Sequence, residues 1–214
     1  MPVETVGPFY SATRNPYNYA KIEQVTRDVA TSWLTLDEIT TQLNMYDDES
    51  QDAYLQMLEL AARMAIEDYL GAAIFATTWR VYYGNIGGYN GQVFLDLPEV
   101  GPGAGVTIDS IQAYTTSNTV PVTISSSGYS YDPTGNRIIL NAVPNELNQS
   151  IVNPVVVTYT QNASDISTYP VVKQAGLLLL THLYNNRSNS TDVNLKEIPF
   201  GIAQLLRPYK PLVM

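Results

Sequence analysis

The chain has 214 residues, no cysteine and a net charge of −9, and only 14% of its residues are charged. That length is enough for one domain of fair size or two small ones. Without cysteine, disulfides, thiolate catalysis and cysteine-bound zinc are excluded. A protein that grips nucleic acid would carry a basic patch. Here, residues 34–76 instead hold nine acidic residues and one basic residue.

Uncharged polar residues and sixteen tyrosines take the place of the missing charges. Such a surface suits permanent contact with other proteins. It is equally typical of a β-rich protein with a naturally polar exterior, and composition leaves both interpretations open. No apolar run is long enough to span a bilayer, and the N-terminus lacks the pattern of a secretion signal. We therefore expect a protein made and kept in a cytoplasm, with no membrane contact.

Residues 1–33 are punctuated by Pro2, Pro8 and Pro16 and show no clear periodicity. They predict an extended N-terminal arm, in which residues 21–29 have the potential to form a short helix.

Two helices are predicted over residues 34–71. Thr35 and Glu38 have the spacing of a capping box at the start of the first. The acidic run 47–50 is expected to open the second, because carboxylates stabilise the positive end of a helix dipole. Apolar residues then recur at helical spacing as far as Gly71, a natural helix stop.

Charged residues on the second helix also follow the helical repeat. Glu59, Arg63 and Glu67 lie four residues apart. This spacing predicts attractive pairs on the face opposite the apolar one, each worth a few tenths of a kcal/mol, roughly.

Residues 77–160 change to strand character, with short alternating runs separated by turns rich in glycine and proline. The pair Asn90-Gly91 is typical of a tight hairpin. The expected strands are residues 77–83, 93–97, 106–115, 120–124, 137–140 and 155–160.

Helical character returns over residues 170–207. Pro170 is in the favoured first position of a helix. Leucine side chains of this helix point to all of its sides, and a helix that is apolar on all sides must be buried on all sides. We therefore expect a neighbouring subunit to cover part of it. A short helix follows over residues 199–206, and Pro208 and Pro211 predict an extended tail over residues 208–214.

The predicted fold class is α+β. Residues 34–76 and 170–207 would form a small helical bundle built from both ends of the chain. Residues 77–160 would be an inserted antiparallel β block, and residues 1–33 and 208–214 would be extended terminal arms.

Groups that converge for catalysis are not evident. The single histidine, His182, lies on the leucine-rich helix, where a core or interface role is far more common than catalysis. The acidic cluster at Asp47, Asp48, Glu49 and Asp52 lacks the glycine and the spacing of a calcium loop. No Gly-Lys-Ser/Thr follows the glycine-rich segments, so they are not phosphate loops. We predict no catalytic, metal-binding or cofactor-binding residues.

In their order and spacing, the segments resemble the head–tail connector (adaptor, or head-completion) family of long-tailed bacteriophages. The resemblance runs from about Leu34 to Lys210. It rests on Leu36-Asp37-Glu38, Ile66-Glu67-Asp68-Tyr69-Leu70-Gly71, Thr78-Trp79, Leu95-Asp96-Leu97-Pro98, Tyr131-Asp132, Val157-Thr158-Tyr159, Pro170-Val171-Val172-Lys173-Gln174-Ala175, Leu183-Tyr184-Asn185-Asn186-Arg187, Ile198-Pro199-Phe200-Gly201 and Leu205-Leu206-Arg207-Pro208-Tyr209. The N-terminal arm and the β block are longer than is usual in that family.

This resemblance implies a ring, normally of twelve subunits, that is docked under the portal in the virion neck and assembled in the host cytoplasm. Double-stranded DNA would pass through it without specific binding, and other neck or tail proteins would dock below it. The family has no catalytic residues. Another neck protein (a stopper or tail-completion subunit) and a tail-associated carbohydrate-binding or depolymerase module are the alternatives.

Three sets of residues are candidates for these contacts. The oligomer interface candidates are Ala61, Ala65, Leu177, Leu178, Leu180 and Tyr184. The portal-docking candidates are Arg207, Tyr209, Lys210 and Leu212. The acidic residues Asp47, Asp48, Glu49 and Asp52 would face the DNA channel or, equally, form a solvated outer face.

Overall fold

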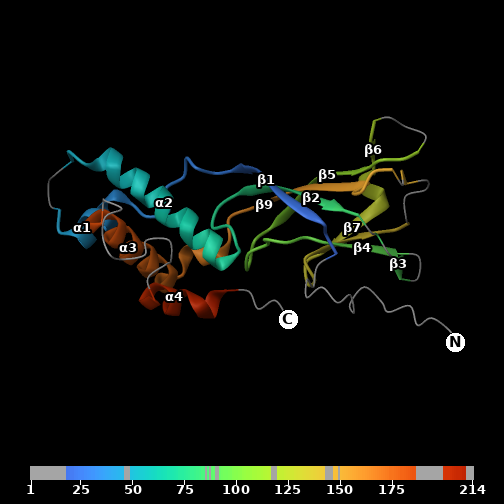
Figure 1. Cartoon of the computed structure of the whole chain (residues 1–214). Helices are drawn as coiled ribbons and strands as arrows, with labels where there is room; N and C mark the ends of the chain where they lie inside the picture. The colour runs from blue at the N-terminus through green and yellow to red at the C-terminus, as the bar shows by residue number, and fades with distance from the viewer. Residues whose placement is uncertain are drawn as a thin grey trace.

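The computed structural model describes residues 18–45, 49–84, 86, 88–89, 92–116, 120–142, 147–148, 150–186 and 200–210. The molecule is elongated, with the helices gathered at one end and the strands at the other (Figure 1). This arrangement confirms the predicted α+β class, with a helical bundle built from both ends of the chain and a β block between them.

The helical end is formed by α1 (Leu36–Leu43), α2 (Asp52–Leu70), α3 (Pro170–Asn185) and α4 (Phe200–Leu206). A 3-10 turn, η4 (Arg207–Tyr209), continues α4. The capping box of Thr35 and Glu38 is present at the start of α1. Gly71 ends α2 in the left-handed conformation, as predicted. The core residues of this end come from all four helices and include Leu34, Ile39, Leu55, Ile66, Val172, Leu180 and Leu206.

The β block consists of two antiparallel sheets. One has the strand order β1-β2-β9-β5-β6, formed by β1 (Lys21–Arg27), β2 (Thr77–Tyr83), β9 (Val155–Gln161), β5 (Val106–Ala113) and β6 (Val122–Thr123). The other has the order β3-β4-β8-β7, formed by β3 (Gly88–Tyr89), β4 (Gln92–Asp96), β8 (Arg137–Leu140) and β7 (Tyr129–Asp132). A shared core lies between them and includes Val81, Leu95, Ile111, Ile138 and Val157.

Residues 21–27 differ from the prediction, because they form strand β1 and not a helix. β1 pairs antiparallel with β2, from Lys21↔Tyr82 to Arg27↔Thr77. Its side chains alternate poorly and only Ile22 among them packs on the β core. The strand therefore depends on its partner and not on its own pattern. Residues 1–17 of the expected arm lie outside the described residues.

Some element bounds and one strand also differ from the prediction. α2 begins at Asp52 and not in the acidic run 47–50, and its first residue is preceded by Gln51 without a side-chain cap. Strand β7, with polar alternate residues, was not predicted. Pro208 lies in the turn η4 and so does not begin an extended tail. Asn90-Gly91 lies outside the described residues, although Tyr89 pairs with Gln92 across it.

The charged row on α2 is buried, contrary to the expected surface series. Glu59, Arg63 and Glu67 are each at most 4% exposed. The Oε1 atom of Glu59 accepts hydrogen bonds from the backbone N–H groups of Trp33 (2.9 Å) and Leu34 (3.3 Å). Buried charges need such partners, because each one loses its hydration on folding.

Arg63 and Glu67 bind the segments that enter and leave the β block. The guanidinium of Arg63 donates to the backbone carbonyls of Asp28 (2.5 Å) and Thr31 (2.6 Å). Glu67 accepts from the backbone N–H of Ile74 over 2.7 Å. One face of α2 thus fixes two of the connections between the helical end and the sheets, those from β1 to α1 and from α2 to β2.

Gln161, at the end of β9, completes this junction. Its fully buried side chain accepts from the N–H of Gly101 (3.1 Å) and donates to the carbonyl of Ala73 (2.8 Å). The residue therefore joins the loop after α2 to the loop between β4 and β5.

Candidate assembly surfaces

The leucine-rich helix is covered mainly by the chain itself, which corrects the expectation that a neighbour must cover it. Leu180 is fully buried and Leu179 is 5% exposed in the helical core. Leu177 packs against the same core, and of the four leucines only Leu178 is exposed, at 37%. Trp33, Leu34 and α2 supply the cover that the sequence pattern did not reveal. Leu180 is therefore covered within its own chain.

The exposed apolar surface lies instead along α2. Met57 is 70% exposed and Met64 is 36% exposed. Ala53 and Ala61 are exposed, and Leu60 is half-buried. The positions 53, 57, 60, 61 and 64 share one helix face, which is distinct from the buried face of α2. We call these five residues the α2 stripe.

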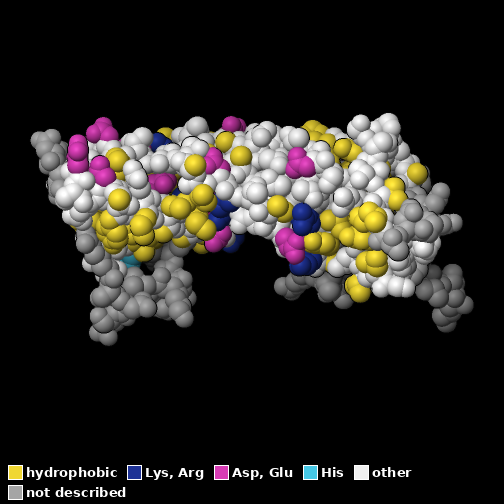
Figure 2. Space-filling model, turned by 90° about the horizontal axis from the view of Figure 1, so that it is seen from above, with side chains coloured by type: hydrophobic (Ala, Val, Ile, Leu, Met, Phe, Trp, Pro, Cys, Tyr) yellow, Lys and Arg dark blue, Asp and Glu magenta, His cyan; other side chains and the backbone are white. Residues whose placement is uncertain are grey.

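Only Ala61 of the α2 stripe was among the predicted interface residues. The other four were missed because the leucines of residues 177–180 gave a stronger apolar signal. Their spacing at positions 53, 57, 60 and 64 is nevertheless helical and was available in the sequence. Figure 2 shows hydrophobic side chains gathered over the helical end, with acidic side chains at its margin.

The two other interface candidates also make contacts within the chain. Ala65 is half-buried and packs against the helical core. The hydroxyl of Tyr184 donates to Gln51 Oε1 over 3.1 Å, and its ring lies 6.2 Å from that of Tyr54. Tyr184 thus holds the end of α3 against the start of α2.

The acidic candidates are only partly described. Glu49 is exposed just before α2, and Asp52 is half-buried at its first position. Asp47 and Asp48 lie outside the described residues. Asp52 is the one acidic residue in the first turn of α2.

The portal-docking candidates lie beyond α4. Arg207 and Lys210 are exposed, whereas Tyr209 is half-buried. The ring of Tyr209 lies 5.4 Å from that of Tyr169, and the ammonium group of Lys210 lies 5.0 Å from the centroid of the Tyr69 ring. Leu212 lies outside the described residues.

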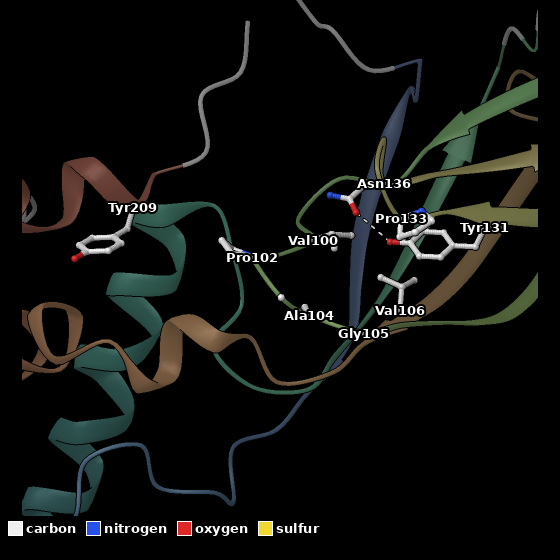
Figure 3. A pocket seen from close by; sticks show the side chains of 11 residues that line it. Val100, Pro102, Ala104, Gly105, Val106, Tyr131, Pro133, Asn136 and Tyr209 are labelled. Carbon is white, nitrogen blue, oxygen red and sulfur yellow. Dashed lines mark hydrogen bonds between the residues drawn. The ribbon is translucent and has the colours of Figure 1, made fainter.

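A groove of about 500 Å³ separates Tyr209 from the β block. Residues 100–106 form its floor, Tyr131, Pro133 and Asn136 form one wall, and Tyr209 forms the other (Figure 3). The Tyr131 hydroxyl donates to Asn136 Oδ1 over 3.0 Å. The lining carries no charged side chain, so the groove suits an apolar segment better than an ion.

His182 is half-buried in the last turn of α3, where its carbonyl accepts from the Asn186 amide over 2.8 Å. Among the described residues, no three His, Asp or Glu side chains come close enough to hold a metal ion. Within the same part of the chain, no helix combines the length and apolarity that crossing a membrane requires.

Comparison with solved structures defines a shared fold. A chain in a structure described as "Virion of native gene transfer agent (GTA) particle" has 19% identity to this chain and a TM-score of 0.58. A chain in "Neck of empty GTA particle computed with C6 symmetry" has 19% identity and a TM-score of 0.59. A chain in "Neck of native GTA particle computed with C12 symmetry" has 18% identity and a TM-score of 0.54.

Each of these matches covers 90% of this chain and 96% of the other chain. The two proteins of each pair therefore share almost their entire length, including the helical end and the β block. No protein-family model matches the chain, and no curated protein matches its sequence.

Proposed function

We propose that this chain is a non-enzymatic structural protein of the neck of a tailed phage-like particle, and more specifically the head–tail adaptor. Twelve copies would form a ring below the portal that continues the DNA channel and receives the next neck or tail protein. The observation that carries this proposal is the fold shared over nearly the full length with chains in neck structures computed with C6 and C12 symmetry.

Subunits of the ring would meet through the α2 stripe. A ring needs a surface on each copy that is apolar at its centre and that contacts a different surface on the next copy. Met57 and Met64 supply such a surface, and methionine adapts its shape readily to a partner. We also place Leu178, Ala61 and Ala65 at this proposed contact between subunits.

The portal would be met by the C-terminal residues Arg207, Tyr209, Lys210 and Leu212, as the family resemblance implies. The exposed cations Arg207 and Lys210 belong to residues 161–214, a segment with five basic and three acidic residues. The rest of the subunit is acidic.

DNA would pass through the ring without binding to it. Each copy carries a net charge of −9, so a ring of such copies would repel the phosphate backbone. The acidic residues 47, 48, 49 and 52 would contribute to this field if they face the channel. Assembly would take place in the bacterial cytoplasm, where portal and tail proteins meet.

Two alternatives remain weaker. A stopper or tail-completion role would use the same neck location, and no feature of the described residues favours it over the adaptor role. A depolymerase would need acidic residues that converge in the β block. Instead, Asp96 is bound to Asn18, and Asp132 is paired with Arg137 at 3.4 Å.

Antibody labelling of particles that contain this chain tests the proposal. We expect gold-labelled antibodies to mark the junction between head and tail in negatively stained particles. Antibodies against a tail-tip protein would serve as the control. Label on the tail tip or the capsid shell alone, or no chain in purified particles, would overturn it.

A further inference from the structure

Four large apolar side chains are exposed on the described helices, and they form two pairs. Met57 and Met64 belong to the α2 stripe, whereas Val171 and Leu178 lie on α3. The members of each pair are seven residues apart in the sequence, which is about two helical turns or about 10.5 Å along the helix axis. Gln174 is exposed between the two apolar residues of α3. We call Val171, Gln174 and Leu178 the α3 face.

The α2 stripe and the α3 face point away from one common core. On α2, the buried core residues Leu55, Ala62 and Ile66 lie on the side of the helix opposite to the stripe. On α3, Gly176 and Leu180 are buried on the side opposite to the α3 face. The two helices pack against each other in the helical end (Figure 1). The α2 stripe and the α3 face of one chain therefore do not meet.

Both surfaces suit an apolar and uncharged partner. Neither the α2 stripe nor the α3 face contains a charged residue. Lys173, the cation beside the α3 face, is paired with Glu38 over 2.8 Å. Asp68, which follows the stripe on α2, lies 3.4 Å from the guanidinium of Arg27. The charges at the margins thus have partners within the chain, and an apolar centre with a polar rim is typical of a protein–protein contact.

The side chains of the two surfaces also have complementary sizes. Ala53 and Ala61 lie one turn on either side of Met57 and leave gaps beside it. Eight residues separate the two alanines, and seven separate Val171 from Leu178. The two apolar residues of α3 therefore have the spacing to fill the two gaps of α2, as ridges of one helix fill grooves of another.

We propose that the α2 stripe of one copy packs against the α3 face of the next copy. The inference rests on the proposed ring and identifies the second surface that the ring requires. A contact between two different surfaces repeats from copy to copy, whereas a surface that pairs with itself closes at two copies. A stripe that paired with itself would also leave Val171 and Leu178 uncovered.

Disulfide cross-linking tests this contact, because the chain has no cysteine of its own. Ala61→Cys/Leu178→Cys is assembled with the portal, and electron micrographs establish whether rings form. A disulfide requires Cα atoms within about 7 Å of each other, a distance that the small Ala61 allows between packed helices. Mild oxidation should then link each subunit to the next and give a ladder of covalent oligomers on a non-reducing gel.

The matched control is Ala61→Cys/Val152→Cys. It keeps the thiol on the stripe and moves the second thiol to an exposed residue just before β9. Oligomers of three or more linked chains should be at least about tenfold less abundant in this control. Equal ladders from the two variants would overturn the inference.

Single-cysteine variants distinguish the proposed contact from self-pairing. Ala61→Cys alone and Leu178→Cys alone should both remain monomeric on the gel. A disulfide-linked dimer of Ala61→Cys would show that the stripe pairs with itself and would overturn the inference. Rings of the double variant without a ladder would also overturn it and leave the adaptor proposal intact. A native chain that forms no ring with the portal would overturn the adaptor proposal and this inference together.

A charge swap provides a second measurement that needs no thiol geometry. Met57→Glu and Leu178→Lys should each lose rings, because each variant buries an unpaired charge in the contact. Met57→Glu/Leu178→Lys should recover rings, because the two charges then face each other across the contact. Met57→Glu/Val152→Lys has the same net charge and should not recover them. Equal ring yields from the two double variants would overturn the inference.

Discussion

A guanidinium nitrogen of Arg27 lies 3.0 Å from the carboxylate of Glu67, and the side chains of both residues are almost completely buried. Arg27 ends the edge strand β1, whereas Glu67 lies in the last turns of α2. The ion pair therefore joins the β block to the helical end. The Oε2 atom of Glu67 has no aligned hydrogen-bond donor among the described residues, so this oxygen depends on the charge of Arg27.

Removing the cation should destabilise the protein in a pH-dependent way. Burial raises the pKa of Glu67, and the charge of Arg27 partly opposes this rise. In Arg27→Met the buried carboxylate loses that cation, and we expect a loss of about 3 kcal/mol in the free energy of unfolding at neutral pH. Urea unfolding followed by circular dichroism measures this quantity.

The direction of the pH effect follows from the raised pKa. Because the pKa of Glu67 is higher in the folded state than in the unfolded state, protonation of Glu67 favours the folded state. This contribution to the free energy of unfolding is fully present below the usual Glu pKa of 4.5 and is lost as the pH rises through the raised pKa. The deficit of Arg27→Met relative to the native protein should therefore grow from acidic to neutral pH. In Arg27→Met/Glu67→Gln, which lacks Glu67, the deficit should depend less on pH, and the rest of the dependence comes from Glu99 and Asp68, the other carboxylates beside Arg27. Parallel profiles for the native protein and Arg27→Met would contradict this account.

Gly176 and Gly201 should respond in opposite directions to the same substitution. Alanine normally stabilises a helix by about 0.5–1 kcal/mol relative to glycine. A Cβ at Gly176 would lie 2.6 Å from the ring of Trp33, which is 4% exposed, whereas nothing lies within 4 Å at Gly201. We expect Gly176→Ala to cost about 1–3 kcal/mol because the core must shift.

Gly201→Ala, by contrast, should stabilise α4 by up to about 1 kcal/mol. Thermal unfolding of both variants compares the two effects directly. A midpoint of Gly176→Ala equal to or above that of the native protein would refute the close approach of α3 to Trp33.

Gln161 should be essential to the junction between the two ends. In Gln161→Met the N–H of Gly101 and the carbonyl of Ala73 both lose a buried partner, and each loss costs about 1–3 kcal/mol. The unfolding free energy should fall by roughly the sum of the two. The matched control is Gln24→Met on β1, because Gln24 is exposed. Equal stability of the two variants would show that the bridge contributes nothing.

Sequence patterns predicted the helices and most strands because these elements bury a regular apolar face. The capping box at Thr35 and the left-handed helix stop at Gly71 depend on neighbouring residues alone, so the sequence predicts both. The sequence does not predict strand β1, because the register of β1 is fixed by its pairing with β2 and not by its own alternation. The charged row of Glu59, Arg63 and Glu67 was misplaced for a similar reason. The backbone groups that bind it belong to the distant residues 28–34 and to residue 74.

The candidate interface was predicted only in part. The excess of leucine over residues 177–180 correctly indicated a buried helix. Leu34 and Trp33 help to cover it, and Trp33 belongs to the segment that was predicted to be an arm. The periodicity of a helix in the sequence indicates how many apolar residues it carries. Tertiary packing determines which of these residues remain exposed. The helical spacing of the α2 stripe is present in the sequence, but the packing of α2 in the helical core decides that these residues, and not the leucines of α3, stay exposed.

Charge on the α2 stripe should prevent ring formation without unfolding the subunit. Met57 is 70% exposed, so Met57→Glu should change the unfolding free energy by no more than about 0.5 kcal/mol. A carboxylate buried at a subunit contact is costly, and rings should be lost. Gln56→Glu adds the same charge one residue away, off the stripe, and should assemble normally. Rings of Met57→Glu in normal yield, in electron micrographs with the portal present, would remove the stripe from the interface.

Cryo-electron microscopy of the neck, in particles that contain this chain, tests the central claim most directly. We predict a ring of twelve copies between portal and tail, with Met57 and Met64 buried at each subunit boundary and the helical ends in contact. A neck reconstruction without this chain, or one in which the α2 stripe faces solvent in every copy, would contradict the account.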